Sequence, residues 1–225
     1  DPKSPNTLYA VHRHEARGLG AAPPSREFSF LKTTDGGNTW IDISQGVHQI
    51  IESIWMSSKW LNPKERSYMA NLLLSSPTSV VIDHANSNIV YITTSAGGAY
   101  RSDDGGKTWK SKSPENYLKT LIATFDRFST AKCEGRKNCK TGYKLISNVF
   151  ATGEVDLSFN NISINPSDPK TIYLATNVGV YRSSDRGDTW HLLNQGLLDP
   201  AVRKVIASSS LVVAEGESGI YKLTE

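Results

Sequence analysis

The sequence predicts an all-β protein built from repeated antiparallel sheets, each of four short strands. Three observations carry this prediction. The segments around Tyr9, Tyr91 and Tyr173 resemble one another, and the tyrosines lie 82 residues apart in both intervals. Each tyrosine follows a polar turn and opens an alternating apolar stretch, as strands do. A turn motif recurs after each tyrosine, and a fixed period of this kind is typical of repeat architectures.

The strands are expected in the same order in each repeat. A first strand, at 80–82 or 162–164, precedes the polar turn, and the tyrosine strand comes second. Third strands are expected at 28–32, 99–101 and 180–182. The last repeat contributes strands at 205–207, 211–214 and 219–222. We therefore expect the first repeat to lack its first strand and the last repeat to lack its fourth.

The strongest motif follows the third strand in three repeats and reads Ser/Thr-x-Asp-x-Gly-x-Thr-Trp. We call it the Asp turn. Its aspartate can accept hydrogen bonds from backbone N–H groups of the turn, its glycine supplies a positive φ, and its tryptophan can pack between neighbouring sheets. The residues in these three roles are Asp35, Gly37, Trp40, Asp104, Gly106, Trp109, Asp185, Gly187 and Trp190.

Repeats with this turn resemble the Asp-box (BNR) β-propellers, and their form looks most like xyloglucanase-type glycoside hydrolases and sortilin-type propellers. The resemblance implies a single β-propeller over 1–225, incomplete in this chain. Its blade segments are 1–45, 79–112, 159–196 and 203–225. Propellers have about 4–8 blades and this chain supplies at most four, so we expect a further segment or another chain to complete the ring. The alternative is a small four-bladed ring with a further N-terminal segment. The motif is a structural turn and implies little about activity.

Three insertions interrupt the blades, at 12–27, 46–78 and 113–158. In a propeller these connections emerge on one face, opposite the Asp turns, and long loops of this kind often carry function. Helical periodicity is expected within 48–74 and again from 113 to 128. These helices either pack onto the propeller or dock a partner.

Several side chains in the insertions are candidate ligand contacts. Trp55 and Trp60 suit either sugar stacking or burial among their apolar neighbours. A basic segment suits either an acidic glycan or acidic partner protein, or a solvated loop. The segment is 132–144, and its basic residues are Lys132, Arg136, Lys137, Lys140 and Lys144, against a single Glu134. Cys133 and Cys139 have five residues between them and are either a small disulfide loop, which requires an oxidising compartment, or two free thiols.

Glycoside hydrolysis requires two carboxylates across the scissile bond. The resemblance to xyloglucanases implies a catalytic aspartate four residues after the strand-two tyrosine. Arg13, Ser95 and Asn177 occupy those positions, and only the last repeat places a carboxylate there, Glu217. Asp156, in an insertion, is a candidate second carboxylate. The Arg-Ile-Pro signature of sialidases is absent from the sequence.

The composition and charge argue against several classes of function. A net charge of +3 is too mild to indicate nucleic-acid binding, and no apolar run approaches the ~20 residues of a membrane-spanning helix. His12, His14 and Glu15 do not make a convincing metal site, and no cofactor or metal is expected. We therefore expect a non-catalytic, extracytoplasmic propeller that binds a protein partner or a polysaccharide. The alternative is a glycoside hydrolase of the xyloglucanase or β-glucanase type, or an inactive relative.

Overall fold

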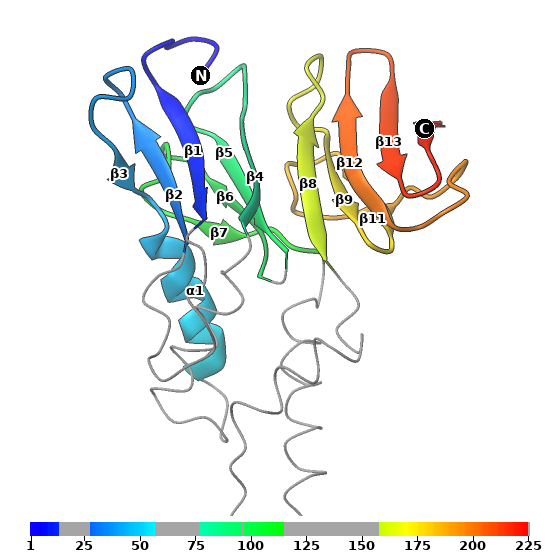
Figure 1. Ribbon diagram of the computed structural model, residues 1–225, viewed down its shortest axis with the longest axis horizontal. Helices are drawn as coiled ribbons and strands as arrows, with labels where there is room; N and C mark the ends of the chain where they lie inside the picture. The colour runs from blue at the N-terminus through cyan, green and yellow to red at the C-terminus, as the bar shows by residue number, and fades with distance from the viewer. Residues whose placement is uncertain (14–27, 57–76, 96, 115–157, 225) are drawn as a thin grey trace, which may run out of the picture.

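The computed structural model describes residues 1–13, 28–56, 77–95, 97–114 and 158–224. It confirms the predicted fold class, because the described residues form four antiparallel sheets and one helix, α1 (Gln45–Met56). The sheets stand side by side along the molecule (Figure 1). We number them first to fourth in chain order. In the described part of the chain, no helix is long and apolar enough to cross a membrane.

The two inner sheets have four strands each and the two outer sheets have three. The first sheet consists of β1 (Leu8–Arg13), β2 (Phe28–Thr33) and β3 (Ile41–Asp42). The second consists of β4 (Pro77–Ile82), β5 (Val90–Thr94), β6 (Gly98–Ser102) and β7 (Lys110–Ser111). The third consists of β8 (Phe159–Ile164), β9 (Ile172–Thr176), β10 (Gly179–Ser183) and β11 (His191–Leu192). The fourth consists of β12 (Val202–Ala207), β13 (Val212–Gly216) and β14 (Ile220–Leu223).

Strand register makes the four sheets comparable position by position. The pairs that join equivalent strands are Leu8↔Thr33, Val90↔Ser102, Ile172↔Ser183 and Val212↔Leu223. By this alignment β1, β2 and β3 match β5, β6 and β7 of the second sheet. The fourth sheet matches the first three strands of the inner sheets.

The core lies between the sheets. β5 and β9 are buried along their whole length, because each inner sheet has a neighbour on both sides. The largest fully buried side chains include Tyr91, Tyr100 and Tyr173. One apolar cluster joins the first three sheets, and a second joins the third sheet to the fourth.

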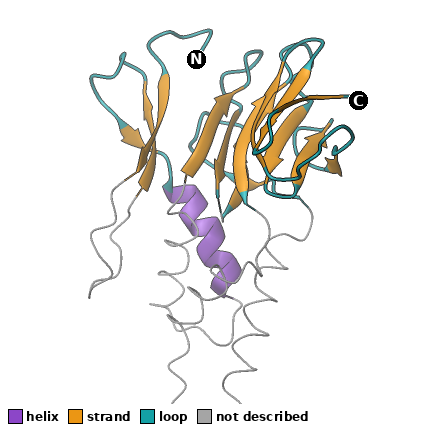
Figure 2. Ribbon diagram, turned by 45° about the vertical axis from the view of Figure 1, so that its right-hand side comes forward, coloured by secondary structure: helices purple, strands orange, loops and turns teal. Residues whose placement is uncertain are grey.

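Helix α1 begins directly after β3. The backbone N–H groups of Val47 and His48 donate to the carbonyl oxygen of Ser44, so Ser44 occupies the N-cap position. Val47 is buried, and α1 extends beyond the ends of the strands (Figure 2). Gly46 allows a close approach here, since a Cβ on this residue would lie 2.9 Å from Cδ1 of Trp109. The helix expected within 48–74 is thus present to Met56, and the rest of that range lies outside the described residues.

Strand direction separates two ends of the molecule (Figure 1). The Asp turns lie at one, which we call the turn end. At the other, the α1 end, lie α1 and the residues that follow β1, β5, β9 and β13. The described residues that flank all three insertions also lie at the α1 end.

Candidate functional site

Each Asp turn is held by the same set of hydrogen bonds. The aspartate Oδ1 accepts the backbone N–H of the threonine four residues later, at 2.9, 2.8 and 2.8 Å for Asp35, Asp104 and Asp185. The same threonine donates its hydroxyl to Oδ2. The hydroxyl that opens the motif donates to the aspartate and accepts the N–H of the turn glycine. The glycines adopt φ values of 100, 95 and 87° for Gly37, Gly106 and Gly187.

These hydrogen bonds lower the pKa of the turn aspartates. For Asp35, donation from the hydroxyls of Thr33 and Thr39 holds the pKa well below its usual range. For Asp104 and Asp185, desolvation raises the pKa, but donation from the turn threonines outweighs it and leaves the pKa at about 2. Each carboxylate is therefore ionised and engaged within its own turn, which is a structural and not a catalytic environment.

Two of the three turn tryptophans join neighbouring sheets. Trp109 Nε1 donates to the carbonyl oxygen of Ile43 at 2.9 Å, and Trp190 Nε1 donates to that of Lys112 at 2.9 Å. Trp40 does not follow the expectation that the tryptophan packs between sheets. It donates to Gly37 of its own turn at 3.0 Å and is 40% exposed. The described residues place no sheet against that face of the first sheet.

A further recurring contact escaped the sequence analysis. The residue four positions after each turn tryptophan is Ser44, Ser113 or Asn194. Its side-chain oxygen accepts the backbone N–H of Phe30, Ala99 or Val180, at 2.7, 3.0 and 3.1 Å. This contact ties the end of the fourth strand to the third. The recurrence of a small polar residue at a fixed distance from the tryptophan was the signal that would have found it.

At the α1 end, two of the positions that the resemblance marks as catalytic serve the backbone. The carbonyl oxygen of Ser95 accepts the N–H of Phe159 at 3.0 Å. The side-chain oxygen of Asn177 accepts the N–H of Ser158 at 2.7 Å. Both contacts hold the start of β8, where the chain re-enters the fold after the insertion 113–158. Arg13 ends β1 at the same end of the molecule.

Glu217 lies in the turn after β13. Its carboxylate forms an ion pair with the guanidinium of Arg203 at 3.1 Å, and both side chains are 64% exposed. Glu217 is therefore solvated and paired with a cation, which is the environment of a surface ion pair.

The other candidate residues stay predictions. The backbone of Trp55 lies in α1, but its side chain is not described. The remaining candidates lie outside the described residues: Trp60, Lys132, Cys133, Arg136, Lys137, Cys139, Lys140 and Asp156. Of the considered metal ligands, His14 and Glu15 also lie outside them. Within the described part of the chain, no group of three His, Cys, Asp or Glu residues could hold a metal ion.

Comparison with known proteins identifies the fold. No family profile matches the sequence, and no curated protein is significantly similar to it. A GH74 enzyme of Niastella koreensis is similar in structure, with a TM-score of 0.53 and 17% identity over 97% of this chain and 25% of that one. The GH74 xyloglucanase of Xanthomonas campestris gives a TM-score of 0.50 and 14% identity over 100% of this chain and 27% of that one. YCF48 of Cyanidioschyzon merolae shares 18% identity over 67% of this chain and 37% of that one, at a TM-score of 0.41.

The described sheets are blades of a β-propeller. The chain spans about a quarter of the length of the two GH74 enzymes. Identities this low carry the fold alone, because propellers of similar shape host many unrelated functions. What this propeller does must therefore be argued from its own residues.

Proposed function

We propose that the protein is a non-catalytic, extracytoplasmic propeller module that binds a protein partner or a glycan at its α1 end. One observation supports the proposal above others. The described residues that flank the three insertions all lie at this end, so about 95 inserted residues attach to one face of a regular scaffold. A scaffold that presents long loops from one face is a common arrangement for recognition.

The contacts made by residues in the turns at the α1 end support a binding role over a catalytic one. Ser95 and Asn177 hold the backbone of β8, and Glu217 is exposed and paired with Arg203. A retaining or inverting hydrolase needs two carboxylates with different environments at a controlled separation. Among the described positions that the resemblance to xyloglucanases marks as catalytic, only one holds a carboxylate. That residue is Glu217, and its side chain is solvated.

The proposed partner is acidic. The basic segment with Lys132, Arg136, Lys137 and Lys140 belongs to the insertion between β7 and β8, whose two described flanks lie at the α1 end. Clustered lysine and arginine attract carboxylate-rich polymers and raise the rate of their association. A disulfide between Cys133 and Cys139 would stiffen this segment and fits an extracytoplasmic location.

Binding of two acidic probes tests the proposal. Polygalacturonate stands for an acidic polysaccharide, and a poly-glutamate peptide stands for an acidic polypeptide. A variant with Lys132, Arg136, Lys137 and Lys140 all changed to glutamate should lose at least about tenfold in affinity for the probe that binds, because each lost cation removes a favourable charge contact. Lys3, Lys107, Lys170 and Lys204 changed to glutamate make the control with the same change in net charge, since these lysines are exposed on the blades.

Equal loss in both variants, or no binding of either probe at about 50 mM salt, would contradict the proposal. The proposed extracytoplasmic location is tested by a separate measurement. The intact mass should rise by two hydrogens on reduction if Cys133 and Cys139 are paired, and an unchanged mass would remove the support for an oxidising compartment.

A glycoside hydrolase is the second candidate, because the last repeat holds a carboxylate, Glu217, at the position that the resemblance to xyloglucanases marks as catalytic. Release of reducing ends from xyloglucan measures this activity directly. Hydrolysis that is abolished by Glu217→Gln and by Asp156→Asn, but kept by Glu215→Gln on the preceding strand β13, would overturn the non-catalytic proposal.

A further inference from the structure

Four buried polar atoms in the joint between the second and third sheets have no hydrogen-bond partner among the described residues. They are Oδ2 of Asp83, the hydroxyl oxygen of Tyr91, and Nε of Arg101 and of Arg186. Asp83 and Tyr91 are fully buried. The guanidinium of Arg186 lies 3.8 Å from Oδ2 of Asp83, and that of Arg101 contacts Asp103. Buried polar atoms almost always have a partner in native proteins, so this group calls for an explanation.

The equivalent joint between the first and second sheets is closed by direct contacts. Tyr9 and Lys32 are paired across β1 and β2, as Tyr91 and Arg101 are across β5 and β6. The ammonium of Lys32 and the hydroxyl of Tyr9 both donate to the carbonyl oxygen of Gly105, at 2.9 and 3.5 Å. The absence of a side chain permits this approach, because a Cβ on Gly105 would lie 2.9 Å from Nζ of Lys32.

The third Asp turn has Arg186 at the position where the first two have Gly36 and Gly105. The three φ values are nearly the same, at 64, 74 and 72°, and Arg186 is the one described residue other than glycine with a positive φ. Strain of this kind persists where the surroundings compensate it. The compensation here is the place of the guanidinium beside Asp83, whose other carboxylate oxygen accepts two N–H groups of its own turn.

The charges of this group determine what can bind to it. Two guanidinium groups face two carboxylates, so the group as a whole is neutral. Burial raises the pKa of Tyr91 to about 12, and Arg101, Arg186, Asp83 and Asp103 all lie close enough to influence it. The hydroxyl therefore keeps its proton at neutral pH. An added ion would introduce an uncompensated buried charge, which is costly. Water carries no charge and can both donate and accept hydrogen bonds.

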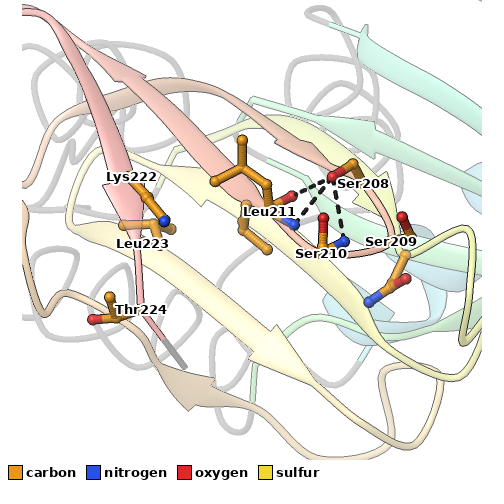
Figure 3. Close-up of a pocket in the computed structure, with 9 residues that line it drawn as sticks. Ser208, Ser209, Ser210, Leu211, Lys222, Leu223 and Thr224 are labelled. Carbon is orange, nitrogen blue, oxygen red and sulfur yellow. Dashed lines mark hydrogen bonds between the residues drawn. The ribbon is translucent and has the colours of Figure 1, made fainter.

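A larger cavity at the turn end of the fourth sheet lacks these properties. It has a volume of about 330 Å³ and is lined by Asn165, residues 208–212 and residues 222–224 (Figure 3). The hydroxyl of Ser208 accepts the N–H of Leu211 within the same turn, at 3.1 Å. None of the lining residues has a buried polar side-chain atom without a partner. The joint between the second and third sheets is therefore the better defined place for a bound molecule.

We propose that this joint is an internal water-binding site that links the second sheet to the third Asp turn. The water donates to Oδ2 of Asp83 and accepts an N–H of Arg186, and the hydroxyl of Tyr91 is a further partner. A separation of 3.8 Å is longer than the ~2.7–3.2 Å of a direct hydrogen bond, and a single water can bridge it. A buried water with about three such partners is a fixed part of a folded protein.

The relaxation of oxygen-17 water counts long-lived internal waters in solutions of the 225-residue protein. Arg186→Gly removes one partner and opens the joint to solvent, while the turn keeps its shape because Gly36 and Gly105 adopt the same φ. We expect this variant to lose about one long-lived water. Arg203→Ala is the matched control, since Arg203 also forms an ion pair but is 64% exposed, and the count should not change. An unchanged count in Arg186→Gly would overturn the proposal.

A crystal structure of the unchanged chain, grown in sodium bromide, tests the site without a variant. We expect a solvent peak about 2.6–3.2 Å from both Oδ2 of Asp83 and a guanidinium nitrogen of Arg186, without anomalous signal. Bromide at this place would make it an anion site, and a direct hydrogen bond between Arg186 and Asp83 would leave no role for water. Either result overturns the proposal. None of these residues belongs to the α1 end, so the outcome is independent of the proposed function.

Discussion

The inner and outer sheets use the same local sequence but bury it differently. Trp109 of the second sheet is 7% exposed, whereas Trp40 at the equivalent position of the first sheet is 40% exposed. Val90 is fully buried, whereas its equivalent Leu8 is 39% exposed. The hydrogen bonds of the Asp turn are nevertheless the same in both sheets. The turn is therefore a local property of its eight residues, and burial is a property of the neighbouring sheet.

This difference separates two sources of stability. The hydrogen bonds to the turn aspartate all come from within the motif, as in other turns that an aspartate stabilises. The joints between sheets gain theirs from side chains that are far apart in sequence, such as Trp109 and Ile43. In a stack of this kind, stability is close to a sum of repeat terms and nearest-neighbour interface terms. Substitutions at equivalent positions can measure the two terms separately.

The largest expected contrast is between Trp109→Ala and Trp40→Ala. Trp109 packs into the core and bonds Ile43, so its removal should cost about 3–5 kcal/mol of unfolding free energy. Trp40 is exposed and bonds its own turn, so its removal should cost about 1 kcal/mol. Denaturant unfolding of the two variants measures both values. Equal losses would mean that the tryptophan acts through the turn and not through the joint.

A second contrast separates backbone strain from packing. Gly37 and Gly106 have φ values of 100 and 95°, so alanine at either should cost about 1–2 kcal/mol. A Cβ on Gly106 would also lie 2.9 Å from Cδ1 of Ile43 on the neighbouring sheet, whereas one on Gly37 would come no closer than 3.8 Å to Trp40. We expect about 1 kcal/mol more destabilisation for Gly106→Ala. The midpoints of thermal unfolding of the two variants test this prediction. A larger fall in the midpoint for Gly37→Ala than for Gly106→Ala would contradict the prediction.

A third prediction concerns the end of the fourth strand. Ser113→Ala removes the acceptor of the Ala99 N–H, a group on a residue that is only 1% exposed. An unsatisfied buried N–H should cost about 1–3 kcal/mol. Ser111→Ala, on the exposed strand β7, is the control and should change the unfolding free energy by less than about 0.5 kcal/mol. Similar effects of the two substitutions would show that the contact does not stabilise the sheet.

The smallest expected effect is a dependence on pH. The pKa of Asp104 is lowered to about 2 from an ordinary value of 3.8. Because the folded-state pKa is the lower one, the stabilisation is fully present above the ordinary value and is lost as the pH falls through about 2. The denaturation midpoint should therefore fall between about pH 5 and pH 2, and less steeply in Asp104→Asn. Solvent exposure of the turn reduces the size of the effect. If the denaturation midpoint depended on pH in the same way in the unchanged protein and in Asp104→Asn, the assignment of this pH dependence to Asp104 would be contradicted.

Much of the fold follows from the sequence because the repeat carries it. The period of the tyrosines and the turns indicated the strands, the turn positions and the all-β class. The first strands were placed too short, at 80–82 and 162–164, whereas β4 and β8 begin at Pro77 and Phe159. Both strands contain a register shift near their start, between Pro77 and Ser79 and between Phe159 and Asn161. Such a shift interrupts the alternation on which the expectation rested.

The site was less predictable, because exposure depends on neighbours that local sequence does not specify. The position of Glu217 after β13 follows from the alignment of repeats, but its pairing with Arg203 depends on the register of β12. The structural role of Asn177 likewise depends on where β8 begins. The contacts of Ser44, Ser113 and Asn194 could have been found, since their spacing from the tryptophan is constant.

The double engagement of Ser44 has a consequence for recognition. Its side-chain oxygen accepts the N–H of Phe30 in β2, and its carbonyl oxygen accepts the N–H groups of Val47 and His48 in the first turn of α1. Gly46 seats the first turn of the helix against Trp109, on the next sheet. The beginning of α1 is thus fixed to two blades before any ligand arrives. A partner that contacts this part of the helix would not have to order it, so that share of the conformational entropy cost of association is already met in folding.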